Sequence, residues 1–366
     1  MLAAALAAAA CATAAGGAGS SLSPADGPRI YVTNQNGASV SVIDVDTRSV
    51  VARVDLQALG FGPNARPHDI AVDPDGSHWY VTLIGENRVL KLDRDNRLVG
   101  QVEMEVPGLA VAHPTEDLLF VGRSMTAVNP PPSVAMIRRS DMTLLEEIDV
   151  LFPRPHALAV RPQGDLVYSA SLAENRIAII DLGSGDVELL DVPAAGTAEA
   201  VAAAADSHAA HDMGAHAAHT LVEFAVSPDG GTLVTGGEIS GDLLVFDLAD
   251  PAAPRLVATV PLGGAPWNPA FSPDGRTVWV PLHRANQVAV VDVATWTVAA
   301  RVTGEGLAQP HAAVPAPDGR TVFVSNNNVN GSAGAVVAID TATRAIVAVL
   351  EVGPNATGMD LAPAAP

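Results

Sequence analysis

His68, His156 and His311 stand at equivalent places in a repeated pattern, each directly after a proline and six residues before the proline of a recurrent turn. The preceding proline fixes the local backbone, which makes the three approach geometries similar. Only 10 histidines occur in 366 residues, so three at one repeat position exceed chance placement. Three neutral imidazoles that meet at one point suit zinc or copper. The sequence therefore predicts a shared metal site.

Two other interpretations of these histidines are open. The Pro-His pair could be the strand entry that this repeat prefers, with each imidazole bonded to a neighbouring carbonyl. The histidines could instead line a pocket for a small anionic ligand, with protonatable imidazoles as donors. Four further residues are candidates for ligand or cofactor binding in the same basin: Arg66, Arg154, Arg123 and His283.

A second group of histidines lies in an insertion at about residues 193–219, within the longest segment between two turns. The insertion is rich in alanine and is expected to be helical, although Gly214 also allows a mobile loop. At about 100° per residue, five potential ligands share one stripe of such a helix. They are His208, His211, Asp212, His216 and His219. We expect this segment to acquire or deliver copper or zinc, the alternative being a solvated low-complexity insertion with incidental histidines.

An internal repeat positions these residues. Pro-Asp-Gly turns recur at 73–76, 227–230, 272–275 and 316–319, and degenerate copies stand at 113–116 and 161–164. The turn prolines are 40 to 48 residues apart, except for 66 across the insertion. Periods of this length with strand-like segments are typical of propeller blades.

Each copy of the repeat holds four strand-like segments, such as 68–72, 78–83, 89–93 and 98–104. The first segment is expected to line a central channel, with the histidines at its mouth. An aspartate ends the third segment and is expected to bond the backbone of its own turn. These aspartates are Asp44, Asp93, Asp181, Asp247, Asp292 and Asp340.

Six copies of the repeat are complete, and the two ends of the chain each hold part of a seventh. Segment 357–363 reads as a first strand without partners, whereas the segment that starts at 29–34 supplies a blade without a first strand. Pairing these two segments closes the ring and removes two open sheet edges. The predicted fold is all-β: a seven-bladed β-propeller of four-stranded blades, closed by the C-terminal strand.

Tyr31-Val32-Thr33-Asn34 spells YVTN, and with the Ser-Pro-Asp-Gly turns the chain resembles the YVTN family of bacterial β-propellers over about 29–363. The resemblance implies the fold and an exported protein. The family and its relatives include lactonase-like enzymes, haem d1 proteins and copper or zinc propellers, so the activity must be argued from the site.

Composition excludes several classes of function. The chain carries 20 Lys and Arg against 40 Asp and Glu, a net charge of −20 that disfavours nucleic acids and anionic lipid surfaces. Hydrophobic residues make up 48% and charged residues 16%, which fits a globular protein with a large core. The single cysteine, Cys11, cannot form an internal disulfide or a cysteine-rich zinc site.

The N-terminal 19 residues are apolar and rich in alanine, as expected of an export signal. Ala8-Ala9-Ala10-Cys11 resembles a weak lipobox, in which Cys11 would carry a lipid anchor, and Ala12-Thr13-Ala14 offers ordinary cleavage instead. The expected organisation is a signal and linker at 1–22 and a single propeller domain at 23–366. Both interpretations place the folded part outside the cytoplasm, as a monomer that meets a membrane only through Cys11.

The sequence favours an extracytoplasmic copper or zinc carrier, or a metal-site scaffold, that exchanges metal with a donating or receiving protein. An enzyme or cofactor-binding propeller, such as a lactonase-like hydrolase or a haem d1 handler, is the alternative, and a ligand-free interaction platform is a third. The sequence carries no strong catalytic motif, so it leaves turnover open. From the ordinary imidazole pKa of about 6.5, metal binding is expected to fade below about pH 6.

Overall fold

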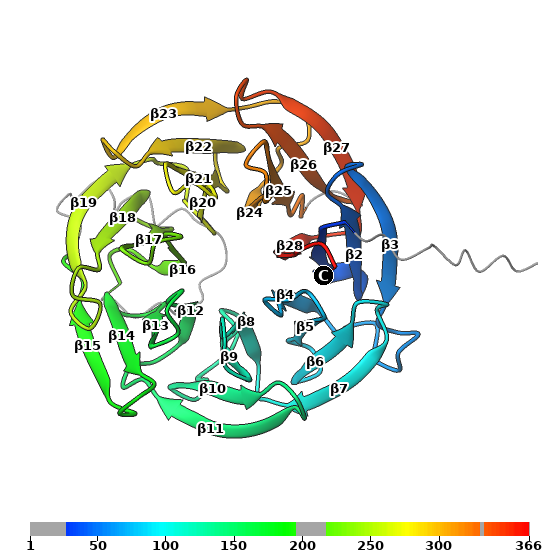
Figure 1. The fold of residues 1–366 in the computed structure, drawn as a ribbon, viewed down its shortest axis with the longest axis horizontal. Helices are drawn as coiled ribbons and strands as arrows, with labels where there is room; N and C mark the ends of the chain where they lie inside the picture. Colours follow the sequence, from blue (N-terminus) through cyan, green and yellow to red (C-terminus); the bar gives the residue numbers. More distant parts are fainter. Residues whose placement is uncertain (1–26, 195–216, 330–332, 366) are drawn as a thin grey trace, which may run out of the picture.

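Short strands separated by Pro-Asp-Gly and other turns cannot bury their apolar faces alone, so successive repeats stack against one another. The computed structural model describes residues 27–194, 217–329 and 333–365. Within these residues, seven four-stranded antiparallel sheets follow one another round a central axis (Figure 1). The predicted all-β, seven-bladed β-propeller is confirmed.

Each blade contributes one strand to each of four concentric positions. The innermost strands are β28 (Ala356–Ala362), β4 (Pro67–Val72), β8 (Pro107–Ala112), β12 (Pro155–Val160), β16 (Leu221–Val226), β20 (Ala270–Phe271) and β24 (Pro310–Pro315). The second strands are β1 (Arg29–Asn34), β5 (His78–Leu83), β9 (Leu118–Arg123), β13 (Leu166–Ser171), β17 (Thr232–Gly237), β21 (Thr277–Leu282) and β25 (Thr321–Asn326). The third strands are β2 (Ser39–Asp44), β6 (Arg88–Asp93), β10 (Ser133–Arg138), β14 (Arg176–Asp181), β18 (Asp242–Asp247), β22 (Gln287–Asp292) and β26 (Gly334–Asp340). The outermost strands are β3 (Ser49–Asp55), β7 (Leu98–Glu103), β11 (Thr143–Asp149), β15 (Val187–Asp191), β19 (Arg255–Pro261), β23 (Thr297–Val302) and β27 (Ile346–Val352).

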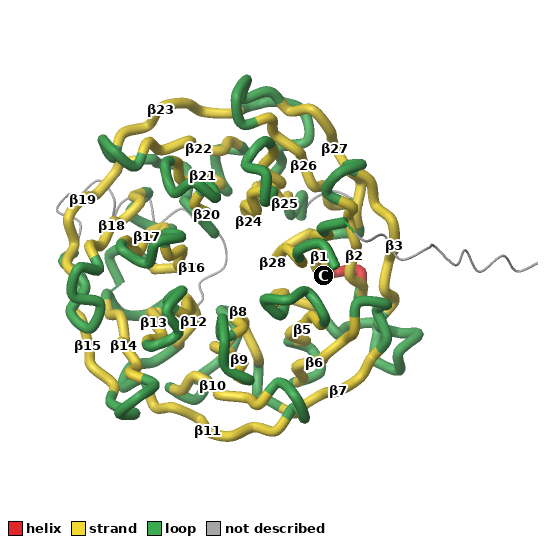
Figure 2. Tube along the Cα trace, viewed as in Figure 1, coloured by secondary structure: helices red, strands yellow, loops and turns green. Residues whose placement is uncertain are grey.

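The position of a strand within its blade decides its burial. Second strands such as β1 and β25 are buried along their whole length, because neighbouring blades cover both faces. Outer strands such as β7 alternate between part-buried and exposed residues, since one face meets solvent. The core therefore lies between blades, as where Tyr31 of β1 stacks on Trp79 of β5 at a centroid distance of 4.6 Å. Figure 2 shows how the strands and the loops that join them alternate around the ring, with the short 3-10 helix η1 (Gln35–Gly37) next to β1.

The ring is closed by β28, which pairs antiparallel with β1 as expected from the sequence. Tyr31 faces Asp360 across this pair, and the Thr33 and Thr357 hydroxyls are 2.7 Å apart. Blade seven is tied to the same strand, because the Ser325 hydroxyl donates to the Thr357 carbonyl at 2.7 Å. Asp360 also accepts the backbone N–H of Val72 in blade two, so the C-terminal strand is a wall of the channel and a link between three blades.

Aspartates that end third strands bond the turns that follow, as predicted. Asp44 Oδ1 accepts from the Thr47 backbone N–H at 2.7 Å, and Asp340 Oδ1 accepts from that of Thr343 at 2.7 Å. The bond from Thr295 to Asp292 is equivalent. These carboxylates stabilise turns on the rim and take no part in the channel.

Blade six departs from the expected regular first strand. The strand expected from residue 267 is reduced to the two residues of β20, preceded by an isolated bridge between Pro266 and Leu282. Pro269 has no N–H to donate, which removes a ladder bond at this place.

Residues 1–26, with the expected export signal and Cys11, lie outside the described part of the chain. In the part that is described, no helix has both the length and the apolarity that a bilayer crossing requires.

Candidate functional site

In every blade, the segment that leads into the first strand contains a residue with a positive φ, in the left-handed region of backbone conformation. This residue fixes the direction in which the chain enters the channel mouth. Its φ is 50° at Arg66, 56° at Arg154, 57° at Ala265 and 56° at Gln309. Its carbonyl accepts the same bond in each blade, for example from Ile84 to Arg66 and from His283 to Ala265. Non-glycine residues seldom adopt this conformation, so its recurrence shows that the seven strand entries are superimposable. The register inferred from the turn prolines is therefore confirmed.

The channel-mouth position lies two residues after this left-handed residue. Around the ring it holds Thr357, His68, Gly108, His156, Val222, Trp267 and His311. His68, His156 and His311 expose only 5%, 3% and 3% of their surface. Three histidines that are distant in sequence therefore sit at equivalent, buried places around one axis.

The rings of His68 and His156 face each other across the mouth. Their centroids are 5.9 Å apart and their planes are inclined by 40°. A zinc–nitrogen bond is about 2.0–2.1 Å, so two rings that share a tetrahedral ion have centroids roughly 5 Å apart. The observed separation of 5.9 Å is close to this distance, so the spacing of the two rings is compatible with a shared ion.

His156 is held in a defined tautomer by its neighbour. Its Nδ1 lies 2.8 Å from the Arg123 carbonyl, and because a carbonyl only accepts, Nδ1 must donate. Nε2 then carries a lone pair, the arrangement usual in metal-binding histidines. Gly108 provides the space, since a Cβ there would lie 2.4 Å from the Arg123 carbonyl atoms.

Several ring nitrogens at the mouth have no hydrogen-bond partner. Both nitrogens of His68 and Nδ1 of His311 are buried and unpaired among the described residues. The indole Nε1 of Trp267 is also buried and has no hydrogen-bond partner among these residues. Buried polar atoms are nearly always paired in folded proteins, so these nitrogens are available to bind a ligand. The alternative in which each imidazole bonds a neighbouring carbonyl holds for His156 alone.

Trp267 connects His311 to a fourth histidine, His283. Its ring centroid lies 4.7 Å from that of His311 and 4.8 Å from that of His283, on which it stacks at 20°. His283 directly follows β21 and is partly exposed. The structure thus places His283 next to the basin, where the sequence analysis expected it.

Burial keeps these imidazoles neutral. It lowers the pKa of His68 to about 3, helped by the charges of His156 and Arg66, and lowers the pKa of His156 to about 4. The pKa of His283 falls to about 4, and that of His311 falls well below its ordinary value, for the same reason. Neutral imidazoles have free lone pairs, which suits metal ions better than anions.

The site is not already arranged around an ion. Within residues 27–194, 217–329 and 333–365, no group of three or more His, Cys, Asp or Glu is spaced to hold a metal. Binding by His68, His156 and His311 together therefore requires their rings to rotate.

The arginines predicted for this basin have different surroundings. Arg66 is exposed, near enough for its charge to lower the pKa of His68. Arg154 donates from Nη2 to the Met125 carbonyl at 2.7 Å. Arg123 is fully buried, and its guanidinium bonds the Glu105 carbonyl, Ser133 and Glu147. Arg123 serves the site through its backbone carbonyl, a contribution that the sequence did not indicate.

His219 is the member of the His-rich insertion that the structure describes, and it is buried outside the histidine cluster. Its Nε2 lies 2.7 Å from the Pro193 carbonyl, and its Nδ1 lies 3.0 Å from the Ser240 hydroxyl. Both nitrogens are therefore engaged, and the imidazole ties the two ends of the insertion together. The other predicted ligands, His208, His211, Asp212 and His216, lie outside the described residues.

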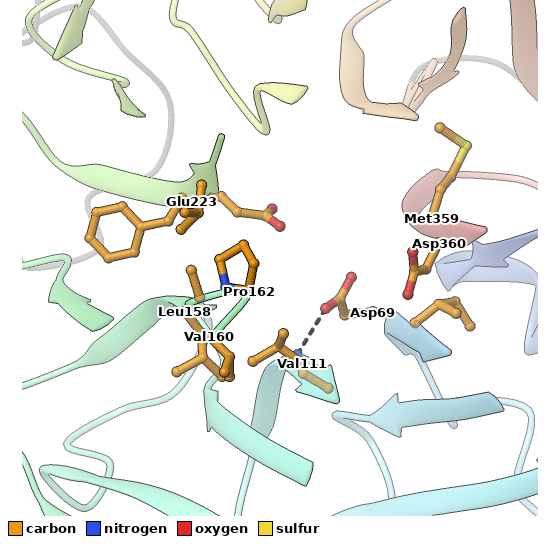
Figure 3. Close-up of a pocket in the computed structure, with 13 residues that line it drawn as sticks. Asp69, Val111, Leu158, Val160, Pro162, Glu223, Met359 and Asp360 are labelled. Carbon is orange, nitrogen blue, oxygen red and sulfur yellow. Dashed lines mark hydrogen bonds between the residues drawn. The ribbon is translucent and has the colours of Figure 1, made fainter. Parts of the chain in front are cut away.

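Three carboxyl groups that the sequence analysis did not single out line a cavity of about 270 Å³ in the channel. They are Asp69 of β4, Glu223 of β16 and Asp360 of β28, and they point into the same space among apolar side chains (Figure 3). Asp69 and Asp360 accept from the Ala110 and Val72 backbone N–H groups, each at 2.9 Å. The sequence feature that could have revealed this cavity is an acidic residue within an otherwise apolar first strand.

Burial opposes ionisation of these carboxyls. It raises the pKa of Asp69 to about 7 and that of Asp360 to about 6, although backbone hydrogen bonds act in the opposite direction. The pKa of Glu223 is raised well above its ordinary value by burial and by the charges of Asp69 and Asp360. Glu223 Oε2 has no hydrogen-bond partner among the residues described.

Glu223→Gln is expected to stabilise the protein under alkaline conditions. A carboxyl whose folded-state pKa is raised holds its proton in the fold, so stability falls as pH rises past the ordinary pKa of the group. Removing the charge should raise the melting temperature by at least about 2 °C at about pH 8, and the gain should shrink towards about pH 5. Thermal melts across this range test it, with the exposed Glu305→Gln as control. Lower stability of Glu223→Gln at about pH 8 would show that the carboxylate has a stabilising partner.

Comparisons with known proteins establish the fold. Kuenenia stuttgartiensis hydrazine synthase is similar with a TM-score of 0.66 and 19% identity, over 88% of this chain and 94% of that chain. Dihydro-heme d1 dehydrogenase NirN, solved in complex with DHE, is similar with a TM-score of 0.62 and 14% identity, over 92% of this chain and 75% of that chain. No family model matches the sequence, and the search of curated proteins also gives no match. The chain is a seven-bladed β-propeller, and its activity must be argued from its own residues.

Proposed function

We propose that this protein is a metal-binding β-propeller in which His68, His156 and His311 bind one copper or zinc ion at the channel mouth. The observation that carries the proposal is the set of three buried, neutral imidazoles from three blades, two of which, His68 and His311, have buried ring nitrogens without a hydrogen-bond partner. A borderline transition metal is the partner that such nitrogens suit best. The Nδ1 bond of His156 to the Arg123 carbonyl supplies the outer support that metal-bound histidines usually have.

The biological role that we propose is metal carriage, or the scaffold of a metal site, outside the cytoplasm. The N-terminal sequence supports export, and the YVTN motif supports membership of an exported propeller family. The acidic surface, with a net charge of −20, favours cations over anions near the protein.

Titration of the untagged protein with Cu²⁺ and with Zn²⁺ tests the proposal. We expect one tight equivalent, accompanied by a change in indole fluorescence, because Trp267 contacts His311. Trp267→Phe should keep the binding and lose most of the fluorescence change, which assigns the signal to the mouth. If wild type takes up no tight equivalent of either metal, the proposal is wrong.

Metal binding is expected to persist to lower pH than ordinary histidines would permit. Protons compete with the metal only below the pKa of each imidazole, and burial has lowered that pKa to about 3 for His68 and about 4 for His156. Affinity at about pH 5.5 should therefore stay within about threefold of its value at about pH 7.5. The ordinary imidazole pKa, which takes no account of burial, predicts instead that binding fades below about pH 6. A tenfold or larger loss by about pH 5.5 would show that solvated histidines hold the metal.

A tetrapyrrole is the second candidate ligand. NirN, whose fold is similar, was solved with DHE, and the channel mouth offers the partly exposed Trp267 ring as a stacking face and the exposed Arg66 as a cation for carboxylates. Mixing the protein with haem and following the absorption spectrum discriminates between the candidates. Stoichiometric haem binding by a protein that takes up no copper or zinc would favour this function.

A further inference from the structure

The partly exposed pair of Trp267 and His283 lies beside the buried histidines and is not needed to complete a three-histidine site. His68, His156 and His311 are almost completely buried, so an ion must pass from solvent into a closed cluster. We infer that His283 is an entry ligand, which takes up the ion first and transfers it to the buried histidines. This inference rests on the proposed metal-binding function.

His283 has the position that an entry ligand requires. It follows β21 on the mouth face, and its backbone N–H donates to the Ala265 carbonyl at 2.9 Å. The six other blades make the equivalent bond from Gln35, Ile84, Ser124, Leu172, Glu238 and Asn327. Blade six is therefore the blade that carries a histidine at this position, directly after the second strand.

A continuous line of ring contacts leads inward from His283. Trp267 contacts His283 and His311 at nearly equal centroid distances of 4.8 and 4.7 Å. His283 and His311 are also near enough for the charge of one to lower the pKa of the other. The indole is thus in contact with both the proposed entry ligand and the buried His311, and an aromatic face attracts cations.

An ion held by His283 would meet the buried ligands at a high effective concentration. The second step then becomes intramolecular, which makes it fast compared with capture from bulk solution. Because the same route serves release, an entry ligand accelerates both directions and leaves the equilibrium affinity unchanged. This signature separates His283 from a permanent fourth ligand, whose loss would weaken the affinity itself.

The test is the rate of Zn²⁺ exchange between the full-length protein and a chromophoric chelator, measured together with the equilibrium Kd. His283→Ala should slow both loading and release by about tenfold and leave Kd within about twofold, as expected for loss of an intramolecular transfer step. His283→Gln, which keeps a polar side chain against Trp267, should behave in the same way and guards against a folding defect in the alanine variant. His78→Ala removes an imidazole at the opposite face and should leave both rates unchanged.

The outcomes separate the inference from the proposed function. Unchanged rates in both His283 variants, with tight wild-type binding, would overturn the inference alone. A Kd weakened tenfold or more in both variants would also overturn it, because His283 would then be a permanent ligand. Absence of tight Zn²⁺ and Cu²⁺ binding in the wild type would overturn the proposed function and the entry role together.

Discussion

Replacing His68, His156 and His311 together by alanine is expected to abolish tight binding of copper and zinc. The three imidazoles supply the proposed ligands, so their loss should weaken binding by at least about 1,000-fold, given the large free energies of metal–histidine sites. The fold should survive, because the unpaired nitrogens of His68 and His311 lose no hydrogen bond and His156 loses only its Nδ1 bond to the Arg123 carbonyl. Calorimetric titration with each metal measures the loss.

The matched control for the triple variant removes an imidazole elsewhere. His78 begins β5 at the face opposite the mouth, so His78→Ala should bind metal as the wild type does. Weak residual binding by the triple variant would come from the histidines of the insertion. A triple variant that binds as tightly as the wild type would show that the mouth is not a metal site, and the tetrapyrrole would become the better candidate.

Deleting residues 354–366 is expected to destroy the stability of the propeller. The deletion removes β28, which pairs with β1, contacts blade seven through Thr357 and accepts the Val72 N–H at Asp360. It also removes fully buried Ala356 and Ala362 and exposes the edge of β1. The loss should approach the whole free energy of unfolding of a typical domain, about 5–15 kcal/mol, with aggregation through the open edge.

Thermal melting and size-exclusion chromatography measure the effect of this deletion. Removal of residues 364–366 alone, which follow β28, is the control and should leave the melting temperature unchanged. If the longer truncation melts within about 2 °C of the full chain, β28 contributes little and the closure does not hold the ring together.

The sequence predicted the ring because each repeat carries its own register marker. The turn prolines align His68 with Trp267 and Thr357. In the structure, each of these three residues lies two positions after a residue with positive φ, whose carbonyl accepts the equivalent backbone hydrogen bond. Closure was predictable for a related reason: segment 357–363 lacked partners and segment 29–34 lacked a first strand. Both inferences depend on local pattern and on the cost of open edges.

The environment of the site could be predicted less well, because it depends on contacts between blades. Repeat position placed His283 near the basin, but its stacking on Trp267 depends on how two neighbouring segments of blade six pack. Nothing in the sequence indicates that Arg123 turns away from the basin to bond Glu147, while its carbonyl holds His156. The lowered imidazole pKa values follow from burial, which a repeat pattern does not measure.

The most direct measurement of the central claim is anomalous scattering from crystals of the protein grown with Zn²⁺ or Cu²⁺. At the absorption edge of the metal, we expect one strong peak at the channel mouth. Ring nitrogens of His68, His156 and His311 should each lie within about 2.0–2.2 Å of it. Absence of a peak at the mouth, or a peak in contact with fewer than two of these histidines, would contradict the account.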